Sequence, residues 1–317
     1  MRLFIIGGAG YIGSHMVKIA HKAGHEVITI DNLSTGHQDA VLYGQFELCD
    51  ILDTKKLTKL FVKYKPDAVM HFSACSLVNE SVLNPYKYYH NNVAGTLSLL
   101  KSMMDNNCKK FIFSSSAAIF GNVEYIPIDE NHPKCPINPY GKTKLMVEEI
   151  LKDFETAYGL KYVSFRYFNA AGHDPEGELS ERHNPETHLL PIIMQAVNGQ
   201  RECVSVFGTD YDTKDGSCVR DYIHVNDLAE IHLKGLEYLN SNNSPSAEFN
   251  LGNGKGFSVK EIIKKVKELT KKDFKVIEGA RRDGDPAILI ASDAKAREQL
   301  RFESNFIDID KIIQTLI

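Results

Sequence analysis

The chain has 317 residues, of which 43% are hydrophobic and 25% are charged; these values are ordinary for globular proteins and argue against disorder. Its 37 Lys and Arg against 41 Asp and Glu give a formal net charge of −4, so no broad basic surface indicates nucleic acid or an anionic membrane as a partner. The length exceeds that of one average domain and predicts two lobes.

The sequence carries no evident targeting or metal signal. Its first apolar run, residues 3–6, is too short for the core of a signal peptide, and no later run approaches the ~20 apolar residues of a membrane span. We therefore expect a cytoplasmic protein. The six cysteines form no CxxC pair and no Cys/His set at zinc spacing. His21 and His25 would share a helical face, but no third ligand follows, so we expect no metal.

Short β-branched runs alternate with longer amphipathic stretches through the first half of the chain. Residues 3–6, 27–30, 68–71 and 110–113 read as strands, and helical patterns lie between them. Each run is continuously apolar, as parallel strands covered on both faces should be. The pattern predicts an α/β fold with a doubly wound, Rossmann-type parallel sheet.

A glycine motif follows the first strand directly. Gly7, Gly10 and Gly13 form GxxGxxG at the start of a predicted helix, where backbone N–H groups and the helix dipole can bind a pyrophosphate. Asp31 ends the second strand and can accept a hydrogen bond from a ribose 2′-hydroxyl, but would repel a 2′-phosphate. An ordinary turn and a solvated strand end are the alternatives. Together the motif and the acid favour NAD over NADP.

Hydroxyl groups follow the strand at residues 110–113. Ser114, Ser115 and Ser116 stand at its carboxyl end, which is the edge where open α/β sheets bind ligands. A serine there can share the proton of a reacting hydroxyl. The alternative is that one or two of these serines only cap loop backbone.

A YxxxK pattern begins the next helix. Asn138 as N-cap and Pro139 at the first helical position predict a helix that starts there, so Tyr140 and Lys144 lie one turn apart on one face. The ammonium, together with a positive nicotinamide, would favour the phenolate and make Tyr140 a base. A half-buried tyrosine beside a surface lysine is the alternative, and the neighbouring motifs argue against it.

The second half is less regular. A strand at 162–166 precedes a loop-rich segment, 169–191; later patterns predict a helix at 225–239, a strand at 248–251, and a helix whose capping box pairs Ser258 with Glu261. We expect this half to form a smaller α/β lobe that shapes a substrate pocket.

The expected boundaries are a nucleotide-binding domain at 1–168, joined by 219–247, and a substrate lobe formed mainly by 169–317.

Further segments, read in order, carry a resemblance over nearly the whole chain. They are residues 31–33, 71–74, 88–93, 111–116, 140–146, 166–169, 219–225 and 281–285. With them the sequence resembles the extended short-chain dehydrogenase/reductase family, most closely its UDP-hexose 4-epimerases. The resemblance implies transient oxidation of a hexose by NAD at carbon 4, followed by reduction from the opposite face. It also implies a homodimer.

The resemblance assigns roles to individual positions, with Ser116, Tyr140 and Lys144 as the catalytic residues. The implied NAD-binding residues are Gly7, Gly10, Tyr11, Ile12, Gly13, Asp31, Asn32, Asp50, Ile51, Phe72, Asn91, Ser114, Tyr140, Lys144 and Phe168. The implied UDP-sugar residues are Ser116, Tyr140, Asn169, Leu189, Phe207, Arg220, Arg282, Asp285 and Leu289. Two arginines in that lobe suit a pyrophosphate, although salt bridges are the usual fate of a lone arginine.

The sequence departs from the family pattern at several positions. Ser76, Ala118 and Phe120 replace a lysine, a threonine and a tyrosine that are frequent in relatives, which weakens secondary contacts. Leu289 stands where a bulkier tyrosine closes the sugar pocket in some relatives, so N-acetylated hexoses are expected to fit. The chain ends at Ile317, short of the tail of many relatives.

Other functions share the fold and the cofactor. A nucleotide-sugar 4,6-dehydratase needs an Asp-Glu pair where this chain has Ala117 and Ala118. A nucleotide-sugar decarboxylase and a pentose 4-epimerase differ mainly in pocket contacts and stay open. A non-catalytic, NAD-sensing scaffold would have no reason to keep Ser116, Tyr140 and Lys144 together.

Overall fold

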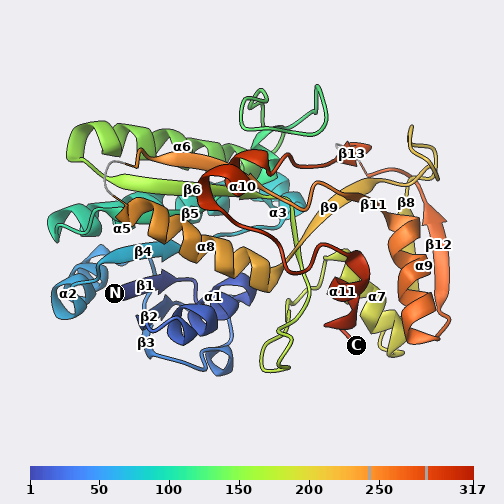
Figure 1. The fold of residues 1–317 in the computed structure, drawn as a ribbon, viewed down its shortest axis with the longest axis horizontal. Helices are drawn as coiled ribbons and strands as arrows, with labels where there is room; N and C mark the ends of the chain where they lie inside the picture. The colour runs from blue at the N-terminus through green and yellow to red at the C-terminus, as the bar shows by residue number, and fades with distance from the viewer. Residues whose placement is uncertain (242–243, 283–284) are drawn as a thin grey trace.

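A seven-stranded parallel sheet organises the larger part of the molecule (Figure 1). The structure is a computed structural model and describes residues 1–241, 244–282 and 285–317. The strands are β1 (Arg2–Ile6), β2 (Glu26–Asp31), β3 (Gln45–Leu48), β4 (Ala68–His71), β5 (Lys110–Ser114), β6 (Lys161–Tyr167) and β10 (Ala247–Leu251). Their order, β10-β6-β5-β4-β1-β2-β3, contains the Rossmann order and confirms the predicted doubly wound sheet.

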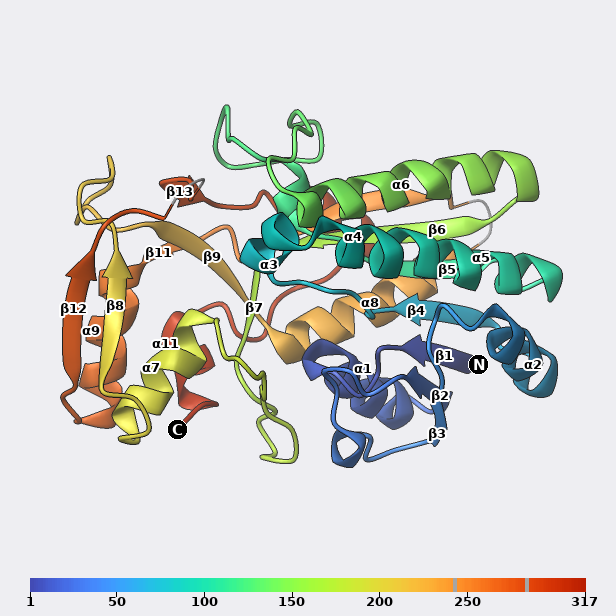
Figure 2. The ribbon, with the colours of Figure 1, turned by 180° about the vertical axis from the view of Figure 1, so that it is seen from behind.

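Helices cover both faces of this sheet, which is why its strands are continuously apolar (Figures 1 and 2). One face packs against α1 (Tyr11–Lys22), α8 (Val225–Asn240) and α10 (Ala294–Leu300). The other face packs against α2 (Thr54–Tyr64), α5 (Gly95–Asp105) and α6 (Pro139–Tyr158). Two separate hydrophobic cores result, one on each side of the sheet.

The large sheet differs from the prediction at its two edges. The edge strand β3 was not predicted, since Gln45–Leu48 is only four residues long and alternates polar and apolar residues in place of a continuous apolar run. The predicted strand at 248–251 exists as β10, and it extends the large sheet beside β6. The chain therefore returns to the large sheet after leaving it.

A smaller set of strands and helices fills the other end of the molecule. β9 (Val219–His224) pairs with β7 (Asn169–Ala171), β11 (Gly256–Ser258) and β13 (Ile288–Leu289), and β8 (Cys203–Phe207) pairs with β12 (Lys275–Gly279). Its core also takes side chains from α7 (Leu189–Val197), α9 (Val259–Thr270) and α11 (Ile309–Gln314). The predicted capping box of Ser258 and Glu261 is present at α9. The domain boundaries stay a prediction.

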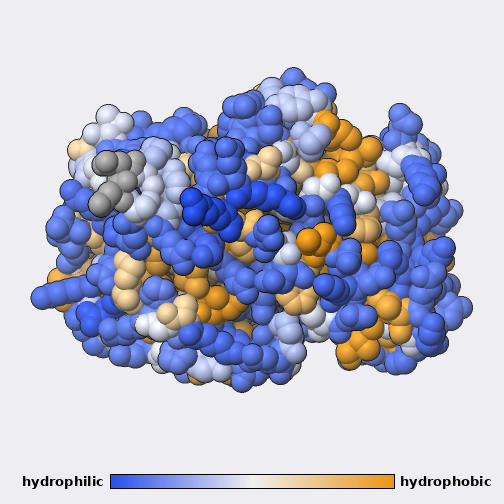
Figure 3. All heavy atoms as spheres, in the orientation of Figure 1, coloured by the Kyte–Doolittle hydropathy of each residue, from blue (hydrophilic) through white to orange (hydrophobic). Residues whose placement is uncertain are grey.

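Short helical segments complete the fold. They are η1 (Gln38–Ala40), α3 (Val78–Leu83), α4 (Pro85–Tyr88), the π-helical η2 (Tyr89–Ala94) and η3 (Ala117–Ile119). Much of the face seen in Figure 3 is hydrophilic, and apolar side chains show as separate patches. None of the helices in the described ranges combines the length and the hydropathy that crossing a bilayer requires.

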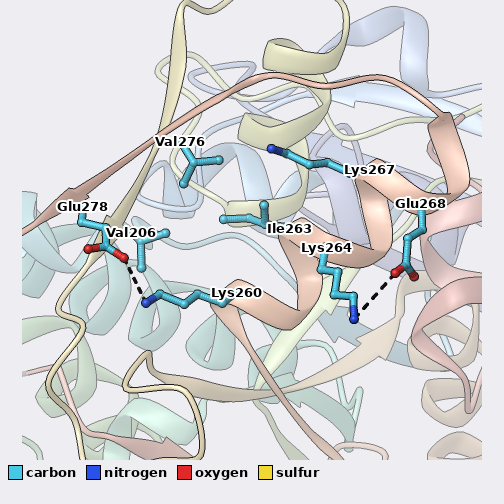
Figure 4. A pocket seen from close by; sticks show the side chains of 8 residues that line it. All are labelled: Val206, Lys260, Ile263, Lys264, Lys267, Glu268, Val276 and Glu278. Atoms are coloured by element: carbon cyan, nitrogen blue, oxygen red, sulfur yellow. Dashed lines mark ion pairs between the residues drawn. The ribbon is translucent and has the colours of Figure 1, made fainter.

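A hollow of about 450 Å³ lies beside α9 (Figure 4). Lys260, Lys264 and Lys267 line it, with Val206 from β8. Two of these lysines are paired, Lys260 with Glu278 at 3.0 Å and Lys264 with Glu268 at 3.8 Å. Neighbouring residues of a strand point to opposite faces, so this hollow and the predicted substrate residue Phe207 lie on opposite sides of β8.

Candidate active site

The glycine loop packs so tightly that two of its glycines have no room for a side chain. A Cβ on Gly7, whose φ is +78°, would lie 2.5 Å from the Ser73 nitrogen, and a Cβ on Gly13 would lie 2.1 Å from the Gly7 carbonyl oxygen. A Cβ on Gly10 would meet only that same oxygen, at 3.4 Å. Gly10 is the N-cap of α1 and offers no side-chain cap. The first N–H groups of α1, at Tyr11 and beyond, are thus available to an anion.

Carboxylates stand at the ends of β2 and β3. Asp31 accepts hydrogen bonds from the Ala9 nitrogen at 3.0 Å and from the Leu33 nitrogen at 2.8 Å, one on each oxygen. Burial raises the pKa of Asp31, and these backbone donors oppose the shift. Each oxygen keeps a second lone pair for a ligand hydroxyl.

Asp50 and its neighbours lie beside this acid. The Asn32 amide donates to Asp50 at 2.8 Å, which ties the end of β2 to the turn after β3. Ile51 is buried against the position of Gly95, where a Cβ would lie 2.5 Å from an Ile51 carbon. Three predicted NAD-binding residues, Asn32, Asp50 and Ile51, therefore form one edge of the site.

The predicted catalytic residues meet where β5 ends and α6 begins. Asn138 caps α6 by accepting from the Gly141 nitrogen at 2.8 Å, as predicted. Lys144, one turn into the helix, is 3% exposed and donates to the Ser114 carbonyl oxygen at 2.7 Å. Its Nζ lies 5.8 Å from the centre of the Tyr140 ring. Ser116 follows β5 and accepts from the Ala118 nitrogen at 3.1 Å.

Burial dominates the electrostatics of this pair. It lowers the pKa of Lys144 to about 7 and raises the pKa of Tyr140, because a desolvated site disfavours both charged forms. A hydrogen bond from Ser116 opposes the shift at Tyr140. The protein alone therefore does not produce the expected phenolate. The second positive charge in that prediction, on the nicotinamide, is needed as well.

Asn92 is a buried residue of this site that the sequence reasoning did not single out. Its amide accepts from the Cys75 nitrogen at 2.8 Å and donates to the Cys75 carbonyl at 3.0 Å and to Thr143 at 3.1 Å. It thus joins the loop after β4 to α6. Asn92 and the predicted NAD residue Asn91 lie in the π-helical η2, an irregularity frequent at functional sites. Two adjacent asparagines inside a helical pattern were the available signal.

Four of the predicted substrate residues gather around β9. Arg220 of β9 forms an ion pair with Asp285 and donates to the Val219 carbonyl at 2.8 Å. Leu289 of β13 lies opposite Arg220. The Asn169 amide, on β7, donates to the Asp221 carbonyl at 2.8 Å.

The other predicted substrate residues lie in two places. The Arg282 guanidinium stands 4.0 Å from the centre of the Phe207 ring, a cation–π contact. Leu189 begins α7 and packs on the core of the smaller part. Residues 283 and 284, inside the predicted motif 281–285, lie outside the described residues.

A small apolar cluster connects the two sets of residues. Phe168, predicted to contact NAD, and Leu289, predicted to contact the sugar, pack on the same buried Ile119 and Phe120. Ile119 and Phe120 belong to the segment that directly follows Ser116. The catalytic hydroxyls and the proposed sugar pocket are therefore neighbours.

Asp221 is a second buried residue that sequence reasoning missed. It is fully buried and accepts from the backbone nitrogens of Asn253 at 2.8 Å and of Gly254 and Ala291 at 3.1 Å. Burial raises its pKa to about 7. Asp221 fixes the loops that flank the strand of Arg220.

Comparison with known proteins agrees with this geometry. Residues 3–252 match the NAD dependent epimerase/dehydratase family. The chain belongs to this family. It is 48% identical over 314 residues to a UDP-glucose 4-epimerase of Halalkalibacterium halodurans, covering 99% of this chain and 94% of that protein.

Solved structures show the same relationship. A UDP-glucose 4-epimerase from Brucella ovis in complex with NAD superposes with a TM-score of 0.96 at 47% identity, covering 99% and 96% of the two chains. A UDP-Glc/GlcNAc 4-epimerase from Campylobacter jejuni superposes with a TM-score of 0.87 at 40% identity, covering 99% and 97%. The predicted fold class and family are confirmed.

The residues present fit NAD. The open N-terminus of α1 at Gly10 leaves room for a pyrophosphate, since no side chain caps it. Asp31 retains acceptor capacity toward a ribose hydroxyl and would repel the extra phosphate of NADP. NAD is therefore the cofactor of this family member, as the sequence predicted.

Proposed function

We propose that the protein is a UDP-glucose/UDP-galactose 4-epimerase. The observation that carries the proposal is the placement of Tyr140, Lys144 and Ser116 at the carboxyl end of β5, in a chain with the family's NAD-binding loop. A 4,6-dehydratase is disfavoured because Ala117 and Ala118 follow Ser116 and neither can act as an acid or a base.

Tyr140 is the proposed acid–base residue. Its phenolate takes the proton of the sugar 4-hydroxyl and later returns a proton to the same oxygen. Ser116, beside it, hydrogen-bonds the reacting oxygen and stabilises the phenolate. Bound NAD supplies the oxidising and reducing capacity at carbon 4, with no net consumption.

Lys144 is proposed to act on Tyr140 and on the cofactor together. Its ammonium, anchored by the Ser114 carbonyl at 2.7 Å, is held at a fixed place beside the Tyr140 ring. Burial makes this charge costly, so the neutral amine is accessible near neutral pH. In its protonated form, Lys144 places a positive charge near the Tyr140 ring, which favours the phenolate.

The substrate residues are proposed to hold UDP and leave the sugar free to turn over. Arg220 and Arg282 provide guanidinium groups that suit a pyrophosphate. Arg220 uses two donors for Val219 and Asp285, which leaves further N–H groups for a ligand. Leu289 is smaller than tyrosine, and we propose that UDP-N-acetylhexosamines are accepted as well.

We further propose a cytoplasmic homodimer. α5 and α6 pack on the same face of the large sheet, and Leu97 on α5 and Met146 on α6 remain 39% and 45% exposed. Apolar side chains on neighbouring helices suit a helix-pair interface. Light scattering on the purified protein measures the mass: a value of two chains supports the dimer, and a value of one removes it.

Product analysis tests the proposed function. The purified protein is incubated separately with UDP-galactose, UDP-N-acetylgalactosamine and UDP-arabinose, without added cofactor. We expect the 4-epimers of the first two. Exclusive turnover of UDP-arabinose would indicate a pentose 4-epimerase instead, and no turnover of any of the three despite bound NAD would contradict the proposal. Release of carbon dioxide from UDP-glucuronate, tested in parallel, identifies a decarboxylase.

A further inference from the structure

Two histidines and two glutamates converge in the segment before α7. They are Glu181, His183, Glu186 and His188, and one nitrogen or oxygen atom from each lies within 4.8 Å of all the others. Nδ1 of His188 is 2.7 Å from Glu181 Oε1, and Nδ1 of His183 is 3.1 Å from the same oxygen. Glu186 is 3.3 Å from His188 and 3.7 Å from His183.

The central carboxylate of this cluster is buried and lacks hydrogen bonds. The Glu181 side chain is 1% exposed, yet neither of its oxygens, nor Nδ1 of His183, has a hydrogen-bond partner in the described part of the chain. The ring nitrogens thus approach Glu181 closely without hydrogen-bond geometry. Buried polar groups without hydrogen bonds destabilise the folded state. Side chains that bind a common metal ion, in contrast, lie close together without hydrogen bonds between them.

We propose that Glu181, His183, Glu186 and His188 bind one structural divalent cation, with Zn²⁺ as the best fit. Imidazole nitrogens and carboxylate oxygens are both ligands of zinc, which is almost always four-coordinate at a structural site. The two carboxylate charges balance the ion. We expected no metal from the sequence because the cysteines lack zinc spacing and the pair His21 and His25 lacks a third ligand. That reasoning did not cover ligands that a loop brings together.

The site lies where the loop covers the start of α1. The His183 ring packs edge-on against the Tyr11 ring, with 6.1 Å between the ring centres. His183 also lines a small hollow with Gly10 and Tyr11. The same segment is anchored earlier by Lys18, which contacts Asp174 at 2.5 Å. Immediately after His188 the chain enters α7 at Leu189. The ion would therefore fix the connection between the dinucleotide loop and the substrate lobe.

Metal analysis of untagged protein tests the site without reference to catalysis. The protein is desalted, its metal content is measured by mass spectrometry, and the metal-free form is titrated with ZnCl₂ alone. We expect about one Zn²⁺ per chain. Co²⁺ bound in place of zinc should give the intense visible absorption of tetrahedral coordination, and added Zn²⁺ should remove it.

Substitutions locate the ion. His183→Gln combined with His188→Gln should lower the affinity for Zn²⁺ by ~100-fold or more, because two of four ligands are lost. His21→Gln, an exposed histidine on α1, is the matched control and should bind like the wild type.

Wild-type protein that takes up no Zn²⁺ and gives no Co²⁺ bands overturns the proposal. Equal zinc binding by the double variant also overturns it, since the ion would lie elsewhere. If the double variant does not fold, the single variant His188→Gln decides, since the His188 side chain is 50% exposed; zinc affinity unchanged from the wild type in that variant overturns the proposal.

Discussion

Glu148 and Arg166 form a buried, two-pronged ion pair between α6 and β6. Arg166 Nη2 lies 2.7 Å from Oε2 of Glu148, and Arg166 Nε lies 2.9 Å from Oε1. Oε1 also accepts a hydrogen bond from the Ser115 hydroxyl at 2.6 Å. Glu148 follows Lys144 by one helical turn. The pair therefore holds the catalytic helix against the carboxyl ends of β5 and β6.

Replacing one member of this pair should destabilise the protein strongly. Glu148→Gln leaves the Arg166 charge buried without its partner, so the free energy of unfolding should fall by about 3–5 kcal/mol. Urea unfolding followed by circular dichroism measures it. Glu149→Gln, at the exposed neighbouring position, should change it by less than about 0.5 kcal/mol. An equal change in the free energy of unfolding at the two positions would show that the buried ion pair does not stabilise the protein more than a surface glutamate does.

Much of the fold followed from local sequence. The continuous strands at 68–71 and 110–113, and the helix capped by Asn138, appear where they were predicted, because burial on both faces and N-capping leave marks within a few residues.

Longer-range features were not predictable in this way. The pairing of β10 with β6 joins residues about 84 apart in sequence, and the edge strand β3 is only four residues long and has no continuous apolar run. The roles of Asp221 and Asn92 depend on loops that meet only in the folded chain. Glu181 and the three residues around it come together through a loop whose geometry no periodic pattern specifies.

Asp31→Asn tests the cofactor site. The amide keeps the size of the side chain but loses the charge that a ribose hydroxyl would donate to. A hydrogen bond to a charged group contributes about 1.5–3 kcal/mol, so the affinity for NAD should fall by roughly 10- to 100-fold. Protein fluorescence during NAD titration measures it. Asp105→Asn, on the surface of α5, should leave it unchanged; unaltered NAD affinity in Asp31→Asn would remove Asp31 from the site.

Asp221 should make stability depend on pH. Its pKa is raised from 3.8 to about 7 in the folded state, so between these values the folded protein holds a proton that the unfolded chain has released. This stabilisation is full below about pH 3.8 and is lost as the pH rises through about 7. Relative to Asp221→Asn, the wild type should be more stable at pH 5 than at pH 8. A stability difference that is the same at both pH values contradicts the shift.

Leu289→Tyr tests the proposed sugar pocket. A tyrosine at this position, packed against the same apolar cluster as Phe168, should fill the space that an N-acetyl group needs. The kcat/KM for UDP-N-acetylgalactosamine should therefore fall by ~10-fold or more, while that for UDP-galactose changes less. Leu289→Met, of similar volume, is the control. A parallel loss with both substrates would indicate general damage to the pocket and not a change in specificity.

The proposed chemistry depends on the phenol of Tyr140. The turnover of a variant that lacks this hydroxyl is therefore the most direct measurement. Tyr140→Phe should lower the turnover of UDP-galactose by ~10²- to 10⁴-fold, with bound NAD and the melting temperature close to wild type. Tyr158→Phe, at the exposed end of the same helix, should retain full turnover. Near-normal turnover by Tyr140→Phe would contradict the assignment of this residue as the acid–base group.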